Sequence, residues 1–418
     1  MSTAVAKVST EPDCRQDFPI LARRVGGKRI VYLDSAATSH RPDVVVDAIA
    51  DFYRGHNANP AAALHSLARE AHQLYEDSRR SLAEFINAYA SDEIIFTRGT
   101  TEAINLVASA WGSTNLKAGD EILLTVAEHA SNLLPWRLIG RETNAVVRYA
   151  NVDDAGRIDV EDFRKKLSRR TRLVSFSHVS NVACYVNPAD QLCTMAREAG
   201  ALSLVDAAQS APHIEVDVRK ISCDFLAFSS HKMLGPMGVG VLFGRRELLD
   251  RMPPYQAGSN MAHEVDLEIE SLERGARRFG AGTPNVSGAV GLAAAVGYLK
   301  KIRRDGIARH EDDITEYALR RLSAIPEVRL LGPTVRENHV PVFSFVLEGH
   351  DAVDVLRSLD ERGVAVRAGD LAALPLLRHF GVEKALRASC HVYSSRDDID
   401  RLAEELRDIA LSGSSGAG

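Results

Sequence analysis

Short runs of apolar residues recur through the first two thirds of the chain, with polar stretches between them. The runs are EIIFT, EILLTV, AVVRYA, RLVSFS, ALSLVDA, FLAFS and VGVLF. Segments with the apolar spacing of a helix, such as TEAINLVASAWG and PADQLCTMAREAGA, separate most of them. Strands that alternate with helices predict an α/β fold, with a mainly parallel sheet that is covered on both faces.

The pattern changes after Thr283. Two long helical patterns, VSGAVGLAAAVGYLKKIRRDG and ARHEDDITEYALRRLSAI, lead into VRLLG, VPVFSFVLEG, VAVRAG, LRASCHVY and a final amphipathic helix. This order predicts a smaller α+β domain. We expect a flexible N-terminus at 1–16, a large domain at 17–290 whose first residues contribute to the small domain, a small domain at 291–411 and a flexible tail at 412–418.

Composition and charge argue against several classes of partner and site. Of the 418 residues, 45% are hydrophobic and 26% charged, the net charge is −5, and no basic arm is present, so we expect no nucleic-acid partner. The five cysteines show no CxxC spacing, which argues against a disulfide framework or a metal site and favours a cytoplasmic location. The longest apolar stretch is too short to span a bilayer, and the first residues do not form a signal peptide.

Polar residues follow several of the predicted strands, at the sheet edge where ligands bind in such folds. In FLAFSSHKMLGPMGVGVLF, Lys232 follows an apolar run and precedes glycines that let the backbone approach a ligand. Most lysines are surface residues, but a partly desolvated lysine loses its proton readily, as Schiff-base formation requires. Asp206 ends the run in LSLVDAAQSAP, where it either caps a helix or keeps a pyridine nitrogen protonated.

Two other strand ends carry candidate residues. In FTRGTTEAINLVA, Thr100 and Thr101 stand at a helix start, where N–H groups and hydroxyls bind a phosphate or simply cap the helix. His129 follows the run in TVAEHASNLLPW. A lone histidine is usually structural, although an imidazole at this place is able to lie flat on an aromatic cofactor.

Together these motifs resemble fold-type I enzymes that use pyridoxal 5'-phosphate (PLP), within the class V aminotransferase superfamily. The most similar group is that of SufS-like cysteine desulfurases and selenocysteine lyases. The resemblance covers nearly the whole chain through VYLDSAATSHRPDVVVDAI, RGTTEAINLVA, EHASNLLPW, HVSNV, VDAAQ, FSSHKMLGPMGVGVLFG, FGAGTPN, VAVRAG and LRAS. It implies PLP as the cofactor and a mainly parallel seven-stranded sheet between helices, with a smaller α+β domain.

The resemblance also implies a role for each matched residue. Three are implied to be catalytic: Lys232 bonds the cofactor and moves a proton, Asp206 pairs with the pyridine nitrogen, and His129 stacks on the ring. The implied cofactor-binding residues are Thr100, Thr101, His129, Asp206, Gln209, Ser229, His231, Lys232 and Thr283. Within this set, Gln209 is implied to face the phenolic oxygen. Thr283 is implied to reach the phosphate of a neighbouring subunit, which predicts a homodimer with composite sites.

An α-amino acid is the substrate that the resemblance implies. Arg387 of LRAS is expected to hold the α-carboxylate with its planar guanidinium. The other residues expected on the substrate side are Asn181, Arg367, Ala37, His65 and Tyr185.

One loop departs from the family pattern in a way that bears on the chemistry. In desulfurases, the loop after R-x-G carries the cysteine that receives sulfur as a persulfide. Here the loop reads VRAGDLAALPLL, with Ala372 at that position after Asp370 and Leu371. Alanine has no nucleophile, so this loop is not expected to relay a persulfide. Cys184 and Cys390 are alternative acceptors, but small buried thiols are the more ordinary interpretation of both.

Two other segments also differ from the family. NPAAALHSL lacks the usual His-Arg pair before His65, and Cys184-Tyr185 replaces the usual Gly-Thr after SNV. Both segments are expected to line the substrate side of the cofactor. A retained cofactor site beside a changed substrate surface predicts a repurposed enzyme and is compatible with specialised metabolism.

The leading functional hypothesis is a lyase that removes a β-substituent from a cysteine- or aspartate-like amino acid. It would act through an external aldimine and a quinonoid as a C–S lyase, desulfinase or β-decarboxylase, without a persulfide cysteine. A class V aminotransferase and an amino-acid epimerase remain open alternatives. A non-catalytic homologue is disfavoured, because every cofactor-contacting position is retained. Asp370 on the loop is compatible with an amine-bearing or cationic substrate.

Overall fold

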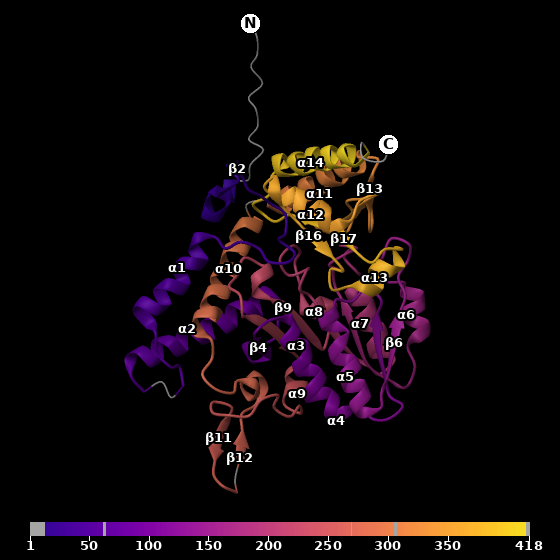
Figure 1. Cartoon of the computed structure of the whole chain (residues 1–418). Helices are drawn as coiled ribbons and strands as arrows, with labels where there is room; N and C mark the ends of the chain where they lie inside the picture. Colours follow the sequence, from indigo (N-terminus) through magenta and orange to yellow (C-terminus); the bar gives the residue numbers. More distant parts are fainter. Residues whose placement is uncertain (1–12, 62–63, 269, 305–306, 415–418) are drawn as a thin grey trace.

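A seven-stranded sheet forms the centre of the computed structural model, which describes residues 13–61, 64–268, 270–304 and 307–414 (Figure 1). The strand order is β4-β10-β9-β8-β7-β5-β6, and only β10 runs antiparallel to its neighbours. The strands are β4 (Ile94–Thr97), β5 (Glu121–Thr125), β6 (Val146–Ala150), β7 (Thr171–Ser177), β8 (Leu202–Asp206), β9 (Phe225–Ser229) and β10 (Gly240–Gly244). The mainly parallel seven-stranded sheet predicted from the sequence is confirmed.

Helices bury both faces of this sheet, because successive strand residues point to opposite sides. Leu123 and Val205 belong to one core, whereas their neighbours Ile122 and Leu204 belong to the other. The first core includes α1 (Asp43–Asp51), α2 (Ser66–Phe85), α6 (Val160–Lys166), α7 (Ala189–Glu198), α8 (Val218–Ile221) and α10 (Val286–Arg304). The second includes α3 (Thr100–Leu106), the π-helical turn Val107–Gly112, α5 (Leu134–Thr143) and α9 (Arg246–Leu249), beside α4 (Ser113–Asn115). Burial on both faces explains the continuous apolar runs.

A second, four-stranded antiparallel sheet lies in the C-terminal unit, which comprises residues 307–414 together with Val31–Leu33 (Figure 1). Its strand order is β13-β14-β17-β16. The strands are β13 (Val328–Leu330), β14 (Val342–Leu347), β16 (Arg367–Gly369) and β17 (Ala385–Ser389). Helices α11 (Ile307–Ser323), α12 (Ala352–Glu361) and α14 (Arg396–Ser414) share its core, and α13 (Leu374–His379) packs with residues of both units.

The N-terminal segment is attached to this C-terminal unit. Strand β3 (Val31–Tyr32) pairs in parallel with β15 (Val364–Ala365). In contrast, α10 crosses the predicted boundary at residue 290 and packs on α1 and α2. The domain limits 17–290 and 291–411 stay a prediction. The flexible ends predicted at 1–16 and 412–418 fall mostly on residues 1–12 and 415–418, which lie outside the described residues.

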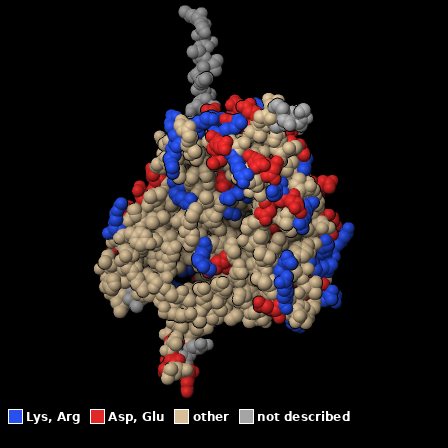
Figure 2. Space-filling model, in the orientation of Figure 1, with Lys and Arg blue, Asp and Glu red and all other residues tan. Residues whose placement is uncertain are grey.

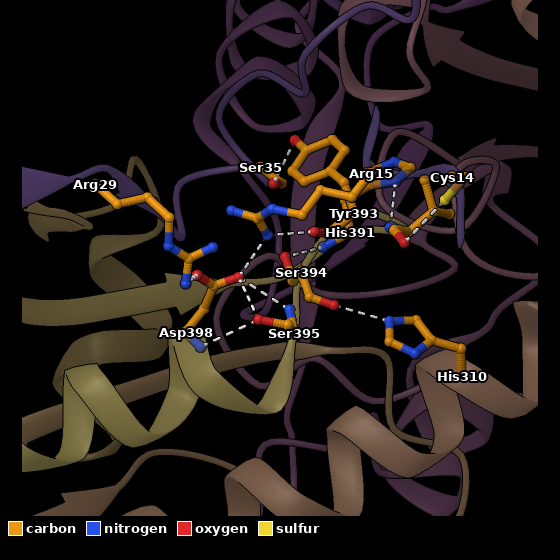
Figure 3. A network of polar contacts seen from close by, with 11 residues as sticks. Cys14, Arg15, Arg29, Ser35, His310, His391, Tyr393, Ser394, Ser395 and Asp398 are labelled. Atoms are coloured by element: carbon orange, nitrogen blue, oxygen red, sulfur yellow. Dashed lines mark hydrogen bonds and ion pairs between the residues drawn. The ribbon is translucent and has the colours of Figure 1, made fainter. Parts of the chain in front are cut away.

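A polar network fixes the described start of the chain, the 3-10 turn Asp13–Asp17, to α14 (Figure 3). Arg15 Nη1 and Arg29 Nη2 contact the Asp398 carboxylate at 2.8 and 3.1 Å. The Ser395 hydroxyl donates to the same carboxylate at 3.0 Å, and the Asp398 side chain is only 3% exposed. Two arginines from the N-terminal segment therefore neutralise one buried acid at the start of α14.

Two hairpins complete the described structure. Strands β1 (Arg24–Val25) and β2 (Lys28–Arg29) form the first, and β11 (Ala262–Val265) and β12 (Glu270–Leu272) form the second. The second hairpin projects from the sheet unit (Figure 1), and acidic side chains gather at its end (Figure 2). Within the described ranges, no helix combines the length and the apolar composition needed to cross a bilayer.

Replacement of Asp398 by asparagine should destabilise the fold, because it leaves two arginines facing a buried position without a counter-charge. We expect a loss of about 2–3 kcal/mol in the free energy of unfolding, measured by urea denaturation. Asp354→Asn is the matched control, since the Asp354–Arg357 pair is about 70% exposed and contributes little. Equal losses in the two variants would contradict the interpretation.

Candidate active site

Five strands of the central sheet end at one edge, and a cavity of about 420 Å³ lies there. Residues that follow β4, β5, β7, β8 and β9 line it from below, and residues of β16, β17 and the loop 370–372 line it from the C-terminal unit. Figure 2 shows a hollow below the C-terminal unit with acidic and basic side chains beside it. The predicted site residues that line the cavity are Ala37, Thr100, Thr101, His129, Asn181, Asp206, Gln209, Ser229, His231, Lys232, Arg367 and Arg387.

Three predicted site residues do not line this cavity within the single chain. His65 caps α2, where its Nδ1 accepts a hydrogen bond from Ala68 N–H at 3.3 Å. The ring of Tyr185 lies 5.6 Å from the Arg157 guanidinium. Thr283 is exposed and accepts a hydrogen bond from an asparagine of the loop before α2. Their roles on the substrate side and toward a neighbouring subunit stay predictions.

Lys232 ends a 3-10 turn that follows β9 directly. His391 Nε2 lies 3.3 Å from the Lys232 carbonyl oxygen, which helps to hold this turn. Burial lowers the pKa of the Lys232 amine to about 8; the carboxylate of Asp206 opposes this shift and the cation of Arg387 adds to it. A larger fraction of the amine is therefore uncharged near neutral pH than for a surface lysine, as attack on an aldehyde requires.

Asp206 stands at the end of β8, beside Lys232 in the cavity wall. Its Oδ1 accepts a hydrogen bond from Ala208 N–H at 2.9 Å. Burial raises the pKa of Asp206, while this hydrogen bond and the nearby Lys232 amine lower it. Gln209 follows in the next turn and donates from Nε2 to Ala36 O at 3.0 Å. Its Oε1 has no hydrogen-bond partner among the described residues, although it is buried.

Hydroxyl and amide groups gather where α3 begins. Thr100 N–H donates to Ser229 Oγ at 2.8 Å, and the hydroxyls of Thr100 and Ser229 lie 2.7 Å apart. A Cβ atom on Gly240 would lie 2.4 Å from the Cα atom of Gly99, so two glycines let β10 pack directly against the helix start. This cluster of small donors fits a phosphate group.

His129 presents a neutral ring to the cavity. Its Nδ1 accepts a hydrogen bond from Ser131 N–H at 3.1 Å, which places the ring proton on Nε2. Burial lowers the pKa of His129 to about 4; the cations of Lys232 and Arg387 lower it as well, and the Asp370 carboxylate opposes them. An uncharged imidazole is suited to stacking on an aromatic ring.

The C-terminal unit supplies the basic groups of the cavity. Arg387 is 4% exposed, and its Nη1 donates to Asn181 O at 3.3 Å. The Arg387 Nε has no hydrogen-bond partner among the described residues. Arg367 also lines the cavity, but half of its side chain is exposed. One guanidinium is thus held rigidly with a donor still available, as capture of a carboxylate requires.

The loop 370–372 forms one side of the cavity. Asn181 Nδ2 donates to Leu371 O at 2.8 Å, and Ala130 N–H donates to Ala372 O at 2.7 Å. Leu371 and Ala372 both have left-handed backbone angles, with φ of 50° and 52°. Neither residue type favours that conformation, so the two hydrogen bonds hold the loop against local strain.

Two carboxylates at this site were not predicted from the sequence. Glu128 is fully buried and accepts hydrogen bonds from Ser177 Oγ at 2.6 Å and Asn132 Nδ2 at 2.7 Å; burial raises its pKa to about 7. Asp34 lies between two arginines, with Oδ2 3.0 Å from Arg367 Nη2. The sequence does contain a signal for both: Asp34 ends the segment VYLD and Glu128 ends the segment LLTVAE, each a charged residue at or near the end of an apolar run.

The donor set of the cavity fits PLP. Lys232 supplies an amine for the aldehyde, Asp206 a buried carboxylate for the ring nitrogen, and the cluster at the start of α3 donors for the phosphate. Buried polar atoms of Gln209 and Arg387 have no protein partner among the described residues, as expected where a ligand completes their hydrogen bonds.

The low pKa of Lys232 can be measured in protein freed of cofactor. Labelling of Lys232 by a limiting amount of an amine-reactive reagent, followed by peptide mass spectrometry, should rise with an apparent pKa of about 8. The exposed Lys220 serves as the internal reference, because its side chain is 77% exposed and the reagent reaches it from solvent. Identical profiles for the two lysines would contradict the proposed desolvation.

Comparisons with known proteins agree with this geometry. The family model described as "Aminotransferase class-V" matches residues 31–402. A protein named cysteine desulfurase from Synechococcus elongatus is 43% identical over 94% of this chain, which spans 63% of that relative's length. The apo structure of a cysteine desulfurase from Thermococcus onnurineus NA1 superposes with a TM-score of 0.90 at 36% identity, over 98% of this chain and 99% of that one.

A third similar protein bears on the cofactor. The structure of a C-DES mutant with glycine covalently linked to its PLP cofactor has a TM-score of 0.80 at 25% identity, over 94% of this chain and 99% of that one. The resemblance, the fold type and the cofactor predicted from the sequence are confirmed. The chain belongs to the class V aminotransferase family and has the fold of fold-type I PLP-dependent proteins.

Proposed function

We propose that this enzyme is a lyase that removes a β-substituent from a cysteine- or aspartate-like α-amino acid, without a persulfide on the protein. It is of the C–S lyase, desulfinase or β-decarboxylase type. The observation that carries the proposal is a cavity lined by the predicted cofactor-binding residues other than Thr283, with alanine at position 372 in its wall. The similar proteins named cysteine desulfurase support chemistry at a carbon–sulfur bond.

The five cysteines of the chain support this proposal, because all of them are buried. The thiolate is the nucleophilic form of cysteine. Burial raises the pKa of both Cys184 and Cys193 to about 12, and it also raises the pKa of Cys223 and Cys390. Cys184 is further occupied by a hydrogen bond from Sγ to Val182 O at 3.0 Å. None of these four thiols is suited to accept sulfur from a ligand in the cavity.

Each lining residue then has a defined task. Bound PLP supplies an electron sink for a bond at the substrate Cα. Lys232 Nζ holds or moves the proton at that carbon, and Asp206 stabilises positive charge at a buried part of the cavity. Arg387 orients the α-carboxylate through its Nε atom, which has no hydrogen-bond partner among the described residues. The loop 370–372 covers one side of the cavity.

The same proposal includes a homodimer in which Thr283 reaches the cofactor phosphate of the partner, and in which His65 and Tyr185 approach a substrate. Exposure of Thr283 on a loop away from its own cavity supports this arrangement. A cytoplasmic location agrees with five cysteines that show no CxxC spacing. A role in specialised metabolism agrees with the changed substrate-side segments.

Transamination is the second candidate function, because the matching family model is that of class V aminotransferases. It needs the same lysine, carboxylate and arginine. It differs from the lyase in one requirement, since a transaminase must receive a keto acid to complete its cycle. Epimerisation makes no such demand and would exchange the Cα proton without net reaction.

The lyase can be tested with PLP-loaded enzyme and L-cysteine, L-cysteine sulfinate or L-aspartate as substrate. Without any keto acid, we expect L-cysteine to give pyruvate, sulfide and ammonia, L-cysteine sulfinate to give alanine and sulfite, or L-aspartate to give alanine and carbon dioxide. The intact protein should gain no sulfur. Lys232→Ala should lower the rate by about a thousandfold or more, whereas Lys220→Ala on the exposed surface should not. Turnover that depends on an added keto acid, or sulfur recovered on a cysteine of the protein, would contradict the proposal.

A further inference from the structure

Asp34 is a mostly buried acid beside the cavity. In the described contacts, its charged neighbours are Arg367 and Arg387. One residue, Leu33, separates Asp34 from the end of β3. Asp34 forms a parallel bridge with Ser389, the last residue of β17. Backbone hydrogen bonds support this bridge, with Ser389 N–H donating to Leu33 O at 2.7 Å. The Asp34 side chain is 16% exposed and does not line the cavity. Its position relative to Arg387 is therefore set by the backbone.

The two arginines are not equivalent partners of this acid. Arg367 Nη2 lies 3.0 Å from Asp34 Oδ2, which is a charge-assisted hydrogen bond. Arg387 Nη2 lies 3.7 Å from Asp34 Oδ1, which is too far for a hydrogen bond, and Oδ1 has no hydrogen-bond partner among the described residues. Arg367 is thus the closer partner of Asp34, while the Nε atom of Arg387 has no hydrogen-bond partner among the described residues.

Apart from the two arginines and Lys232, the titratable side chains that line the cavity are acidic or neutral. Asp370 lines the cavity mouth and is exposed, and His129 is uncharged at neutral pH because burial lowers its pKa. Lys232 is committed to the cofactor under the proposed function. A ligand with one carboxylate can pair with Arg387. A ligand with a second anionic group would have to break the Arg367–Asp34 pair or lie close to Asp34 and Asp370.

We propose that Asp34 determines substrate charge: by holding Arg367 it leaves one arginine for the ligand, so that the site selects α-amino acids with an uncharged side chain. This inference rests on the proposed function only in so far as the cavity binds an α-amino acid. Among the candidate substrates, it favours cysteine-like compounds over aspartate- and sulfinate-like ones. Asp34 acts through Arg367 and Arg387 and is a specificity-determining residue, not a catalytic one.

Two ligands of equal shape test this selection: L-2-methylasparagine and L-2-methylaspartate. Neither has a proton at Cα, so binding to PLP-loaded enzyme can be followed by the cofactor absorption band and by calorimetry without proton abstraction. We expect the wild-type enzyme to bind the amide at least about tenfold more tightly than the acid. Asp34→Asn should strengthen binding of the acid by about tenfold and change binding of the amide less than about threefold, since one negative charge beside the arginines is removed.

Asp398→Asn is the matched control, because Asp398 also neutralises two arginines but lies on α14, in the network of Figure 3. It should lower stability and leave the ratio of the two affinities unchanged. If this variant does not fold, Asp120→Asn replaces it, since Asp120 pairs with Arg172 at 2.9 Å at the start of β5. Arg367→Gln should further weaken binding of the acid, because it removes a positive charge and leaves Asp34 unneutralised.

Equal or tighter binding of L-2-methylaspartate by the wild-type enzyme would overturn the inference, and this measurement does not depend on the folding of any variant. An unchanged affinity ratio in folded Asp34→Asn would also overturn it and would assign Asp34 a structural role. The outcome is separable from that of the proposed function. If the ratio behaves as expected but no β-elimination products form, charge selection stands and the lyase proposal fails. If elimination occurs without charge selection, the lyase proposal stands and the role of Asp34 fails.

Discussion

The burial of a lysine amine beside a carboxylate at the strand ends is the constraint on which the rest of the structure depends. Desolvation lowers the pKa of Lys232 to about 8 and raises that of Asp206. Each group alone would be costly to bury, and each partly offsets the cost of the other. The sheet keeps the two groups together, because β8 and β9 are parallel neighbours that end at the same edge.

The two units of the chain contribute different groups to the cavity around this pair. The sheet unit supplies the groups suited to the cofactor, from backbone that two buried faces hold rigid. The C-terminal unit supplies the arginines and the loop 370–372, which line the other side of the cavity, and the N-terminal segment supplies Asp34 beside them. A change of substrate can therefore arise in the second group without disturbing the first. The alanine at position 372 and the paired Arg367 lie in this second group.

The features that depend on local pattern could be predicted from the sequence. Apolar runs alternating with helical segments indicated the parallel sheet, and polar residues at run ends indicated part of the cavity lining, including Lys232 and Asp206. The other predicted lining residues, such as Arg387, were implied by the family resemblance. The same patterns did not reveal that β10 runs antiparallel or that β3 pairs with β15, because such pairings join segments distant in sequence. Asp34 was missed for the same reason, since its partners lie on β16 and β17. Glu128 was not predicted, because the adjacent His129 was the residue selected at the end of that apolar run.

The central claim, from which the others follow, is that PLP bonds the amine of Lys232. Borohydride reduction of the loaded enzyme fixes the cofactor to the amine that holds it, and peptide mapping then locates the modified residue. We expect the label on the peptide that contains Lys232, and none after replacement of that lysine by alanine. A label on another lysine, or PLP that leaves the reduced protein on denaturation, would contradict the claim.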